Sequence, residues 1–370
     1  MKALITLALL ADEGTKLNWL LVVEVFAAIG AVLHAISFIR EIIRRLNRPV
    51  DKKLTERSRK DYVLGVAYSL LCALLWSLSY ISLSYVSPKA NLLAVNIVLL
   101  GSASLFLLVF WSAAEYCRAQ RGRGQPRPID WKSISPWIVV LTNLASFLLF
   151  IYALRFVSAS QTISLQKTNP LFIALLTLIW LRKKPSKFSL SAVVLVVFGA
   201  ILILANDQFR FDDSNNITGS VIALLAGLSF AVFSVGIEKI EQEEVSFMRG
   251  LGFMSMVFLL SYIGLVTIGY FEGDSPSFDK GTVGILILNG LRVAIVYGLY
   301  QAAIRRIGAL LASVVVALEV PFTMVWDWRL LDHVPGTRLV FGAVAILIGA
   351  ITLVWDRSPW MLGTKAAEVQ

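Results

Sequence analysis

The stretch YALRFVSASQTISLQKTNPLF, residues 152–172, decides the fold when it is set beside QAAIRRIGALLASVVVALEVPF, residues 301–322. Each stretch has a basic residue where a tight helix–helix corner is expected, then small residues, then a proline inside an apolar segment. The two prolines, Pro170 and Pro321, are 151 residues apart. Self-similarity of this kind predicts that the chain contains an internal repeat.

The composition of the 370-residue chain is that of an integral membrane protein. Hydrophobic residues make up 57% of it and charged residues only 16%, with a mean hydropathy of +0.75. A soluble domain averages about a quarter charged residues, and a globule of this composition would expose too much apolar surface to water. A disulfide scaffold is excluded as well, because Cys72 and Cys117 lie in or beside apolar segments and are expected to be reduced.

Eleven apolar segments are long enough to cross a bilayer as helices, which takes about 20 residues. The predicted spans are Leu17–Phe38, Val63–Val86, Asn91–Ala114, Ser135–Phe156, Ser160–Leu181, Ser189–Ala205, Ile217–Ile240, Ser246–Tyr270, Thr282–Ala303, Ala309–Leu330 and Thr337–Trp355. The first span lies outside the repeat, which leaves five spans in each half. Because five is odd, the second half enters the membrane in the opposite direction. The sequence thus predicts an all-α polytopic membrane protein with two inverted five-helix repeats, ten spans in all, plus one extra N-terminal transmembrane helix.

The predicted organisation has five parts. Residues 1–39 form the extra N-terminal helix, 40–62 a basic cytoplasmic linker, 63–205 the first repeat, 206–355 the second repeat and 356–370 a cytoplasmic tail. The linker either lies along the inner leaflet and attracts anionic lipid headgroups or is a solvated segment that sets topology. Gly199, Gly342 and Gly349 are expected to be contacts between packed helices.

The distribution of Lys and Arg predicts the orientation of the chain. With the N-terminus outside and the C-terminus cytoplasmic, 24 of the 34 basic residues fall in inner loops and 8 in outer segments. This bias follows the positive-inside rule, and we expect the protein in a plasma (inner) membrane. The net charge of +10 is therefore a topology signal and not the footprint of a nucleic acid.

Residues 153–180 (ALRFVSASQTISLQKTNPLFIALLTLIW) and residues 304–350 resemble the EamA-like drug/metabolite transporter superfamily. The resemblance covers about Val63 to Trp355 and implies ten helices in two inverted repeats and a transporter function. The chain departs from the family pattern in its extra N-terminal helix, its basic linker and the Arg and Lys residues after Trp180, where Gly-Glu is usual. The pair Lys167-Thr168 is also similar to the basic position of the sugar-phosphate and nucleotide-sugar branch.

The segment SQTISLQKTN, residues 160–169, is the strongest pointer to a site. Eight of its ten residues are polar, so it must be buried in protein or line a watery cavity. On a helical wheel Gln161, Ser164, Lys167 and Thr168 share one arc of about 120°, whereas Gln166 lies elsewhere. The prolines that follow in each half, Pro170 and Pro321, are expected to free the backbone carbonyls of Gln166 and Ala317.

Charged residues inside the membrane are costly and usually functional. The sequence places Glu24, Lys167, Arg292 and Glu319 there. Arg292 and Glu319 are each the eleventh residue of a predicted span, so we expect them to form an ion pair at the midplane. Lys167 then remains as a positive charge that either loses its proton or holds an anionic group.

Aromatic residues on neighbouring spans are expected to wall this site, or else to be ordinary core residues. The candidate substrate-binding residues are Lys167, Thr168, Ser164, Gln161, Arg292, Glu319, Trp76 and Tyr80, with Tyr297 and Tyr300 beside Arg292 on its helix. Walker, metalloprotease and hydrolase motifs are absent from the sequence, so we expect no enzyme activity, cofactor or metal.

The pattern favours a secondary transporter that moves a small polar or amphipathic, anionic metabolite by alternating access, in export or exchange. Its expected partners are that metabolite, membrane lipids, and protons or a counter-substrate, with no nucleic acid. Two alternatives stay open: a flippase for a lipid-linked precursor, and a non-transporting membrane scaffold or receptor. A cavity lined by Lys167 would favour transport, whereas a filled apolar centre would favour the scaffold.

Overall fold

The computed structural model describes residues 53–86, 91–120, 134–153, 156, 159–182, 186–204, 214–242, 247–272, 280–331 and 337–356. Within these ranges the regular structure is entirely α-helical. The predicted span Leu17–Phe38, with Glu24, and residues 40–52 of the basic linker lie outside the described residues.

The helices follow the predicted apolar spans. They are α3 (Lys53–Val86), α4 (Leu92–Gln120), α5 (Ile134–Ala153), α6 (Ala159–Gln166), α7 (Asn169–Ile179), α8 (Lys187–Leu204), α9 (Ser214–Gln242), α10 (Phe247–Glu272), α11 (Lys280–Val316), α12 (Glu319–Leu331) and α13 (Thr337–Asp356). In the described part of the chain, six helical segments are long and apolar enough to cross a membrane. Shorter apolar helices run over Asn169–Ile179, Ser189–Leu202 and Val340–Leu353.

The span predicted over Ser160–Leu181 is divided into two short helices, α6 and α7. The corner predicted between the spans Thr282–Ala303 and Ala309–Leu330 lies at Gly308, where non-helical dihedral angles separate two helical segments that share the label α11 (Lys280–Val316). Gly308 has φ 78° and ψ 161°, a conformation that turns the helix within one residue and that only glycine adopts readily.

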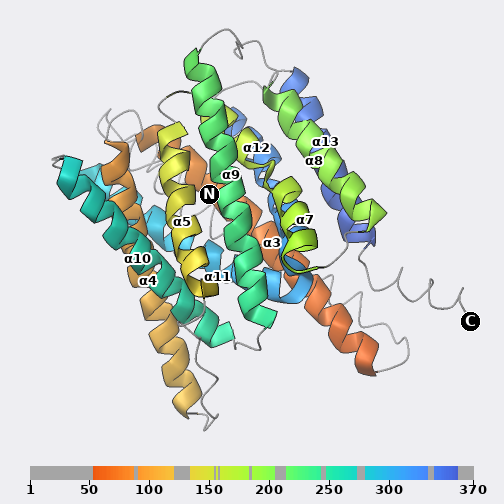
Figure 1. Cartoon of the computed structure of the whole chain (residues 1–370), viewed down its shortest axis with the longest axis horizontal. Helices are drawn as coiled ribbons and strands as arrows, with labels where there is room; N and C mark the ends of the chain where they lie inside the picture. The colour runs from red at the N-terminus through yellow and green to blue at the C-terminus, as the bar shows by residue number, and fades with distance from the viewer. Residues whose placement is uncertain are drawn as a thin grey trace, which may run out of the picture.

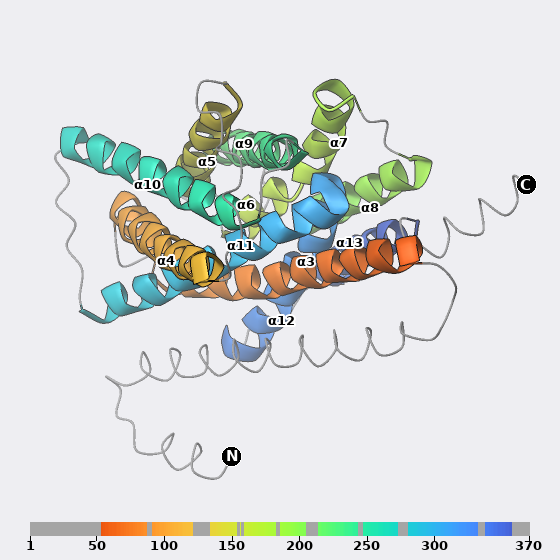
Figure 2. The same cartoon turned by 90° about the horizontal axis from the view of Figure 1, so that it is seen from below.

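The helices pack in pairs that join the two halves of the chain. α8 lies along α13 and α4 along α10, and α3 packs against α11 as α5 packs against α9 (Figures 1 and 2). The shorter helices behave in the same way, since α7 contacts α9 and α12 contacts α3. Contacts such as α3–α11 and α5–α9, or α7–α9 and α12–α3, thus occur in similar form with the two halves exchanged.

Close packing of small residues holds the α8–α13 pair together. A Cβ atom at Gly199 would lie 2.5 Å from the carbonyl oxygen of Gly342, and one at Gly349 would lie 2.9 Å from that of Ala192. Only glycine allows backbones to approach so closely. The prediction that these three glycines are helix-packing contacts is confirmed.

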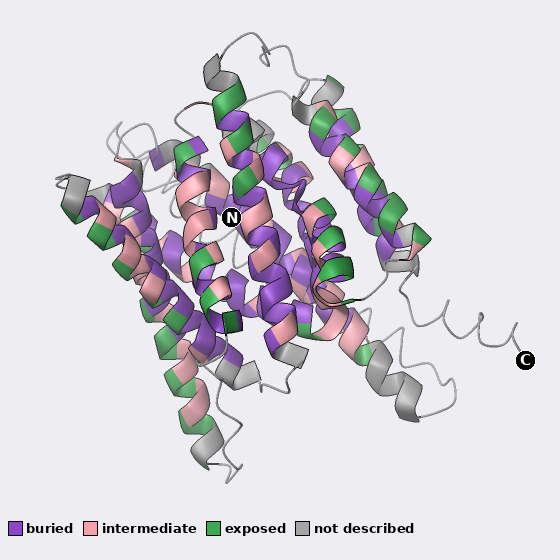
Figure 3. Cartoon of the chain, in the orientation of Figure 1, coloured by how far each residue is buried: buried purple, intermediate pink, exposed green. Residues whose placement is uncertain are grey.

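The outward faces of the bundle are apolar. Val194 and Phe198 on α8 and Phe341 and Ile351 on α13 are each more than half exposed. Figure 3 shows such exposed residues on the outer helices, with buried residues toward the centre. A bilayer accommodates large apolar side chains on a helical surface, whereas water does not. The described helices therefore belong to an integral membrane protein.

Candidate functional site

A break in the fifth predicted span places Lys167 inside the bundle. α6 ends at Gln166, and Lys167 and Thr168 form the turn before α7. The N–H of Thr168 donates to the Leu165 carbonyl at 3.1 Å, an i→i+3 bond that tightens the chain there. Pro170 lacks an N–H and cannot continue the α-helical ladder, which accounts for the position of the break.

The second half of the chain contains a matching break. Ala317 and Leu318 form a turn between α11 and α12, and the Leu318 N–H donates to the Val315 carbonyl at 3.1 Å. Pro321 follows this turn as Pro170 follows the first. Glu319 is the first residue after the turn, and its side chain is fully buried.

The two breaks are joined by a buried ion pair. The Nζ of Lys167 lies 2.6 Å from the Oε1 of Glu319, and the two side chains are 3% and 0% exposed. The predicted pair between Arg292 and Glu319 is therefore wrong. Equal depth in two spans did not determine which way each side chain points, and Lys167 from the other half occupies the position beside the carboxylate.

Arg292 is held by polar groups instead. Its Nη1 donates to the Ser82 hydroxyl at 3.0 Å and to Asn289 Oδ1 at 3.3 Å, and the residue is 5% exposed. These partners hold the guanidinium between α3 and α11, and Arg292 is not among the residues that line the cavity described below. The structure thus separates Arg292 from the other candidate residues.

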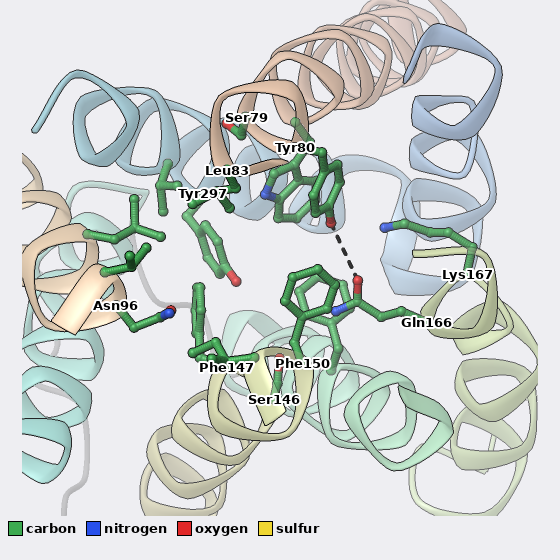
Figure 4. Close-up of a pocket in the computed structure, with 16 residues that line it drawn as sticks. Ser79, Tyr80, Leu83, Asn96, Ser146, Phe147, Phe150, Gln166, Lys167 and Tyr297 are labelled. Atoms are coloured by element: carbon green, nitrogen blue, oxygen red, sulfur yellow. Dashed lines mark hydrogen bonds between the residues drawn. The ribbon is translucent and has the colours of Figure 1, made fainter. Parts of the chain in front are cut away.

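A cavity of about 70 Å³ lies beside Lys167. It is lined by residues of both halves: Trp76, Ser79, Tyr80, Leu83, Val95, Asn96, Leu99, Ser146, Phe147, Phe150, Ile151, Gln166, Lys167, Phe230, Val293 and Tyr297. Three of the predicted residues, Lys167, Trp76 and Tyr80, line it, and so does Tyr297 (Figure 4).

Aromatic rings make most of the wall next to the cation. The Lys167 ammonium lies 5.3 Å from the Trp76 ring and 5.9 Å from the Phe230 ring, distances at which a cation is attracted to a π face. Trp76 packs edge-on against Tyr297 at 5.5 Å. Tyr300, predicted beside it, is fully buried and donates to Ser234 at 3.0 Å, so it is a core residue.

Polar atoms occur at a few points on this wall. The Tyr80 hydroxyl donates to the side-chain oxygen of Gln166 at 3.4 Å (Figure 4). Asn96 and Ser146 line the cavity from α4 and α5. A mostly apolar cavity with a few convergent polar groups is the usual form of a small-molecule site.

Several predicted features do not form the cavity. The Thr168 hydroxyl donates to the carbonyl of Leu165 at 2.8 Å, within its own turn. The Ala317 carbonyl accepts the N–H of Val320 at 3.1 Å, so the prediction that it is free is wrong. The side chains of Gln161 and Ser164 lie outside the described residues.

The helical wheel left Gln166 out of the site, because Gln166 lies off the arc shared by Gln161, Ser164, Lys167 and Thr168. In the structure Gln166 is the last residue of α6 and lines the cavity. The backbone of Gln166 also faces α9, where a Cβ atom on Gly227 would lie 3.0 Å from the Gln166 carbonyl oxygen. Asn96 and Ser146 could have been found as isolated polar residues within apolar spans.

Metal ligands do not gather in the described part of the chain, where no group of three His, Cys, Asp or Glu residues could hold an ion. The cavity offers instead one buried cation with its counter-ion, a set of aromatic faces and a few amide and hydroxyl groups. This arrangement is suited to binding a small molecule.

The EamA-like transporter family matches residues 63–205 and again residues 217–355. The chain belongs to this family. A curated relative from Archaeoglobus fulgidus, named "Uncharacterized transporter", is 25% identical over 289 residues, which cover 75% of this chain and 93% of that protein. A second, "Uncharacterized transporter YxxF" from Bacillus subtilis, is 25% identical over 324 residues, covering 82% of this chain and 93% of that protein.

This EamA-like protein also shares its fold with a solved crystal structure. The TM-score is 0.62 at 13% identity, with 78% of this chain and 97% of the other covered. The family, the names of its relatives and the apolar helices together identify a membrane transporter.

Proposed function

We propose that this EamA-like protein is a secondary transporter for a small amphipathic metabolite with an anionic group. The observation that carries the proposal is the ion pair between Lys167 and Glu319 at the edge of an aromatic cavity. Each partner comes from a helix break in a different half of the chain. A scaffold would have no need for a charged cavity at its centre, because burying charge is costly.

The chemistry of the cavity supports the substrate class. An anionic group that enters the cavity competes with Glu319 for the Lys167 ammonium, while Trp76 and Phe230 contact the apolar part of the molecule. Glu319 then lacks its counter-charge in a buried site, which is unfavourable unless another cation compensates it. A proton or a cationic counter-substrate therefore accompanies the anion in this mechanism.

The arrangement of the helices supports alternating access between two inverted repeats, residues 63–205 and 206–355. Ser104 on α4 and Ser255 on α10, 151 residues apart, donate reciprocally to each other's backbone carbonyl at 3.4 Å. The offset equals that between Pro170 and Pro321. Reciprocal contacts between corresponding residues are what a pseudo-twofold axis through the bundle would produce, and transport sites lie at such repeat interfaces.

The topology completes the proposal. Each repeat has five spans, the extra N-terminal helix precedes them, the N-terminus is outside and the C-terminus is cytoplasmic, in the plasma membrane. The bias of 24 inner against 8 outer basic residues supports this orientation. Export or exchange is favoured over uptake by analogy with the family alone.

The test begins with purified protein and three classes of probe: sugar phosphates, nucleotides and amino acids. We expect one class to raise the thermal unfolding temperature and to be transported into liposomes. The double variant Lys167→Gln/Glu319→Gln removes both charges of the pair and keeps polar side chains. We expect it to fold and to lose both binding and flux.

The matched control is Lys239→Gln. The Lys239 ammonium lies 5.1 Å from the Trp180 ring, so this variant also removes a cation from an indole face, but outside the cavity. It should transport at the wild-type rate. The proposal fails if no probe of any class binds the wild-type protein, or if the double variant transports normally.

A further inference from the structure

A second, larger hollow lies on the outside of the bundle, and we call it the lateral groove. It has a volume of about 310 Å³ and is lined by Tyr68 of α3, Phe110 of α4, Leu251 of α10 and Ala294, Ile295, Gly298, Leu299, Ala302 and Arg306 of α11. Ile295 is 37% exposed, so the groove opens away from the bundle. Its wall is apolar apart from Arg306, whose Nε lies 3.8 Å from the Asp61 carboxylate.

The lateral groove follows the axis of α11. The residues from Ala294 to Arg306 extend over about 18 Å of helix, more than three turns. They include a row of small residues at a spacing of four, namely Ala294, Gly298 and Ala302. Small residues at this spacing are typical of a helix that another transmembrane helix approaches closely.

The groove lies toward the end of the bundle at which α3 begins. The Arg306 guanidinium lies 5.1 Å from the ring of Tyr68, in the first half of α3, whereas Arg292 donates to Ser82 near the end of α3. The first segment of α11 therefore runs antiparallel to α3. Residues 39–52 connect the predicted N-terminal span to the start of α3, so that span also runs antiparallel to α3 and parallel to the first segment of α11.

The sequence of the predicted span Leu17–Phe38 has one face suited to contact with protein. Within residues 22–36, one arc of about 100° contains the ionisable and small residues Glu24, Ala27, Ala31, His34 and Ala35. The opposite arc contains bulky apolar residues alone: Val22, Val25, Ile29, Val32, Leu33 and Ile36. A charge and a row of small residues are unfavourable or wasted against lipid, so the first arc is expected to pack on the bundle.

The two rows of small residues match in spacing and depth. Ala27, Ala31 and Ala35 repeat every four residues, as the row on α11 does. Ala35 comes three residues before the end of its predicted span and Ala302 one residue before the end of its own, so their depths agree within about 3 Å. Because the helices are parallel, this agreement holds along the whole row.

We propose that the lateral groove is the docking site of the N-terminal helix Leu17–Phe38, with Ala27, Ala31 and Ala35 toward α11. The docked helix becomes a part of the bundle and supports α11, whose Val293 and Tyr297 line the central cavity. This contact does not depend on what the protein transports, so it holds or fails independently of the proposed function.

The experiment cross-links the full chain through pairs of cysteines in native membranes. The pairs Ala27→Cys/Ile295→Cys and Ala31→Cys/Leu299→Cys are made in a Cys117→Ser background, in which the remaining Cys72 is buried. A specific protease site is inserted between Pro49 and Val50. After mild oxidation and cleavage, a disulfide keeps the N-terminal fragment attached to the rest of the chain on a non-reducing gel.

We expect both pairs to cross-link roughly tenfold faster than matched controls on the opposite face of the N-terminal helix, because a disulfide requires Cα atoms within about 7 Å. The controls are Ile29→Cys/Ile295→Cys and Leu33→Cys/Leu299→Cys, at nearly the same depths. In the first pair, Ala31→Leu should slow cross-linking, because a bulky side chain keeps the helices apart. Val32→Leu, on the opposite face, should not.

Three outcomes would overturn the proposal. These are cross-linking of the packing-face pairs no faster than of their controls, an equal effect of Ala31→Leu and Val32→Leu, and attachment of the fragment when the single variants Ala31→Cys and Leu299→Cys are co-expressed, which would show that a second copy supplies the helix. Thermal unfolding shows that each variant is folded before the gels are compared. The pair Ala27→Cys/Ile295→Cys decides the matter if the other pair does not fold.

Discussion

Lys167 and Glu319 depend on each other energetically. Neither side chain reaches solvent, and the ammonium and the carboxylate are 2.6 Å apart. A buried charge that loses its partner is strongly destabilising, whereas removal of both partners is often tolerated. Substitution of one partner should therefore lower stability, whereas substitution of both should affect transport in a protein that still folds.

We expect Lys167→Met to lower the free energy of unfolding by about 3 to 5 kcal/mol, because it leaves Glu319 buried without a counter-charge. Glu319→Gln should have a similar cost, because it leaves Lys167 in the same position. The double variant Lys167→Met/Glu319→Gln should be much closer to the wild-type protein than the sum of the two. Denaturant unfolding in detergent micelles measures all three.

Lys239→Gln is the control for this measurement. The Lys239 cation lies at the Trp180 ring, outside the cavity, so the variant shows how much free energy of unfolding is lost when a cation unrelated to the pair is removed. Additive effects in the double variant would mean that Lys167 and Glu319 are stabilised independently. That result would contradict the importance of their contact.

At the scale of the elements, the kink at Gly308 divides α11 into two helical segments. Gly308 turns the chain, and Glu238 on α9 accepts the backbone N–H of Ala309 at 2.8 Å, where the helix begins again. A carboxylate in this position satisfies an N–H that the kink would otherwise leave unpaired. The kink thus sets the direction of the segment that leads to Glu319.

Gly308→Ala should lower the free energy of unfolding by about 1 to 3 kcal/mol, because its φ of 78° and ψ of 161° are strained for any residue with a Cβ atom. Space is not the obstacle, since the nearest atom to an added Cβ, an oxygen of Glu238, is 3.5 Å away. Thermal and denaturant unfolding in micelles test this.

Gly284→Ala on the same helix is the control. Nothing lies within 4 Å of a Cβ atom there, so the change should be neutral or stabilising by up to about 1 kcal/mol, through helix propensity. A Gly308→Ala protein as stable as Gly284→Ala would mean that the backbone at residue 308 relaxes without cost.

At the scale of the whole molecule, the pairing of helices between halves makes each half depend on the other. α3 packs along α11 and α5 along α9, and the cavity has walls from both halves. Neither half could bury its inward faces alone. The cavity thus lies between the two halves of the chain.

The orientation predicts which positions an impermeant thiol reagent reaches. In a Cys117→Ser background, in which the remaining Cys72 is buried, we expect Glu13→Cys to be labelled on intact cells. Lys53→Cys should be labelled only after permeabilisation, because the basic residues around it are retained inside. Labelling of Lys53→Cys and not Glu13→Cys on intact cells would reverse the proposed topology.

Much of the fold could be read from hydropathy. The helices from α3 to α13 lie within or around the predicted apolar spans, and the polar run before Pro170 is buried, as expected, at each described side chain from Gln166 to Asn169. Lys167, Trp76 and Tyr80, three of the candidate residues, line the cavity, and their role in substrate binding stays a prediction. The corner expected between Ala303 and Ala309 is the kink at Gly308, where two helical segments meet.

The sequence by itself determined the membrane environment, the helical class and the segments that had to be shielded from lipid. These are local properties, because a segment in a bilayer must satisfy its own backbone and must hide its polar side chains. Only the tertiary structure decided that Glu319 pairs with Lys167 and not with Arg292, and that Gln166 faces the cavity. The partner of a side chain depends on the rotation of each helix, and contacts such as that of Gly227 with the Gln166 backbone set this rotation.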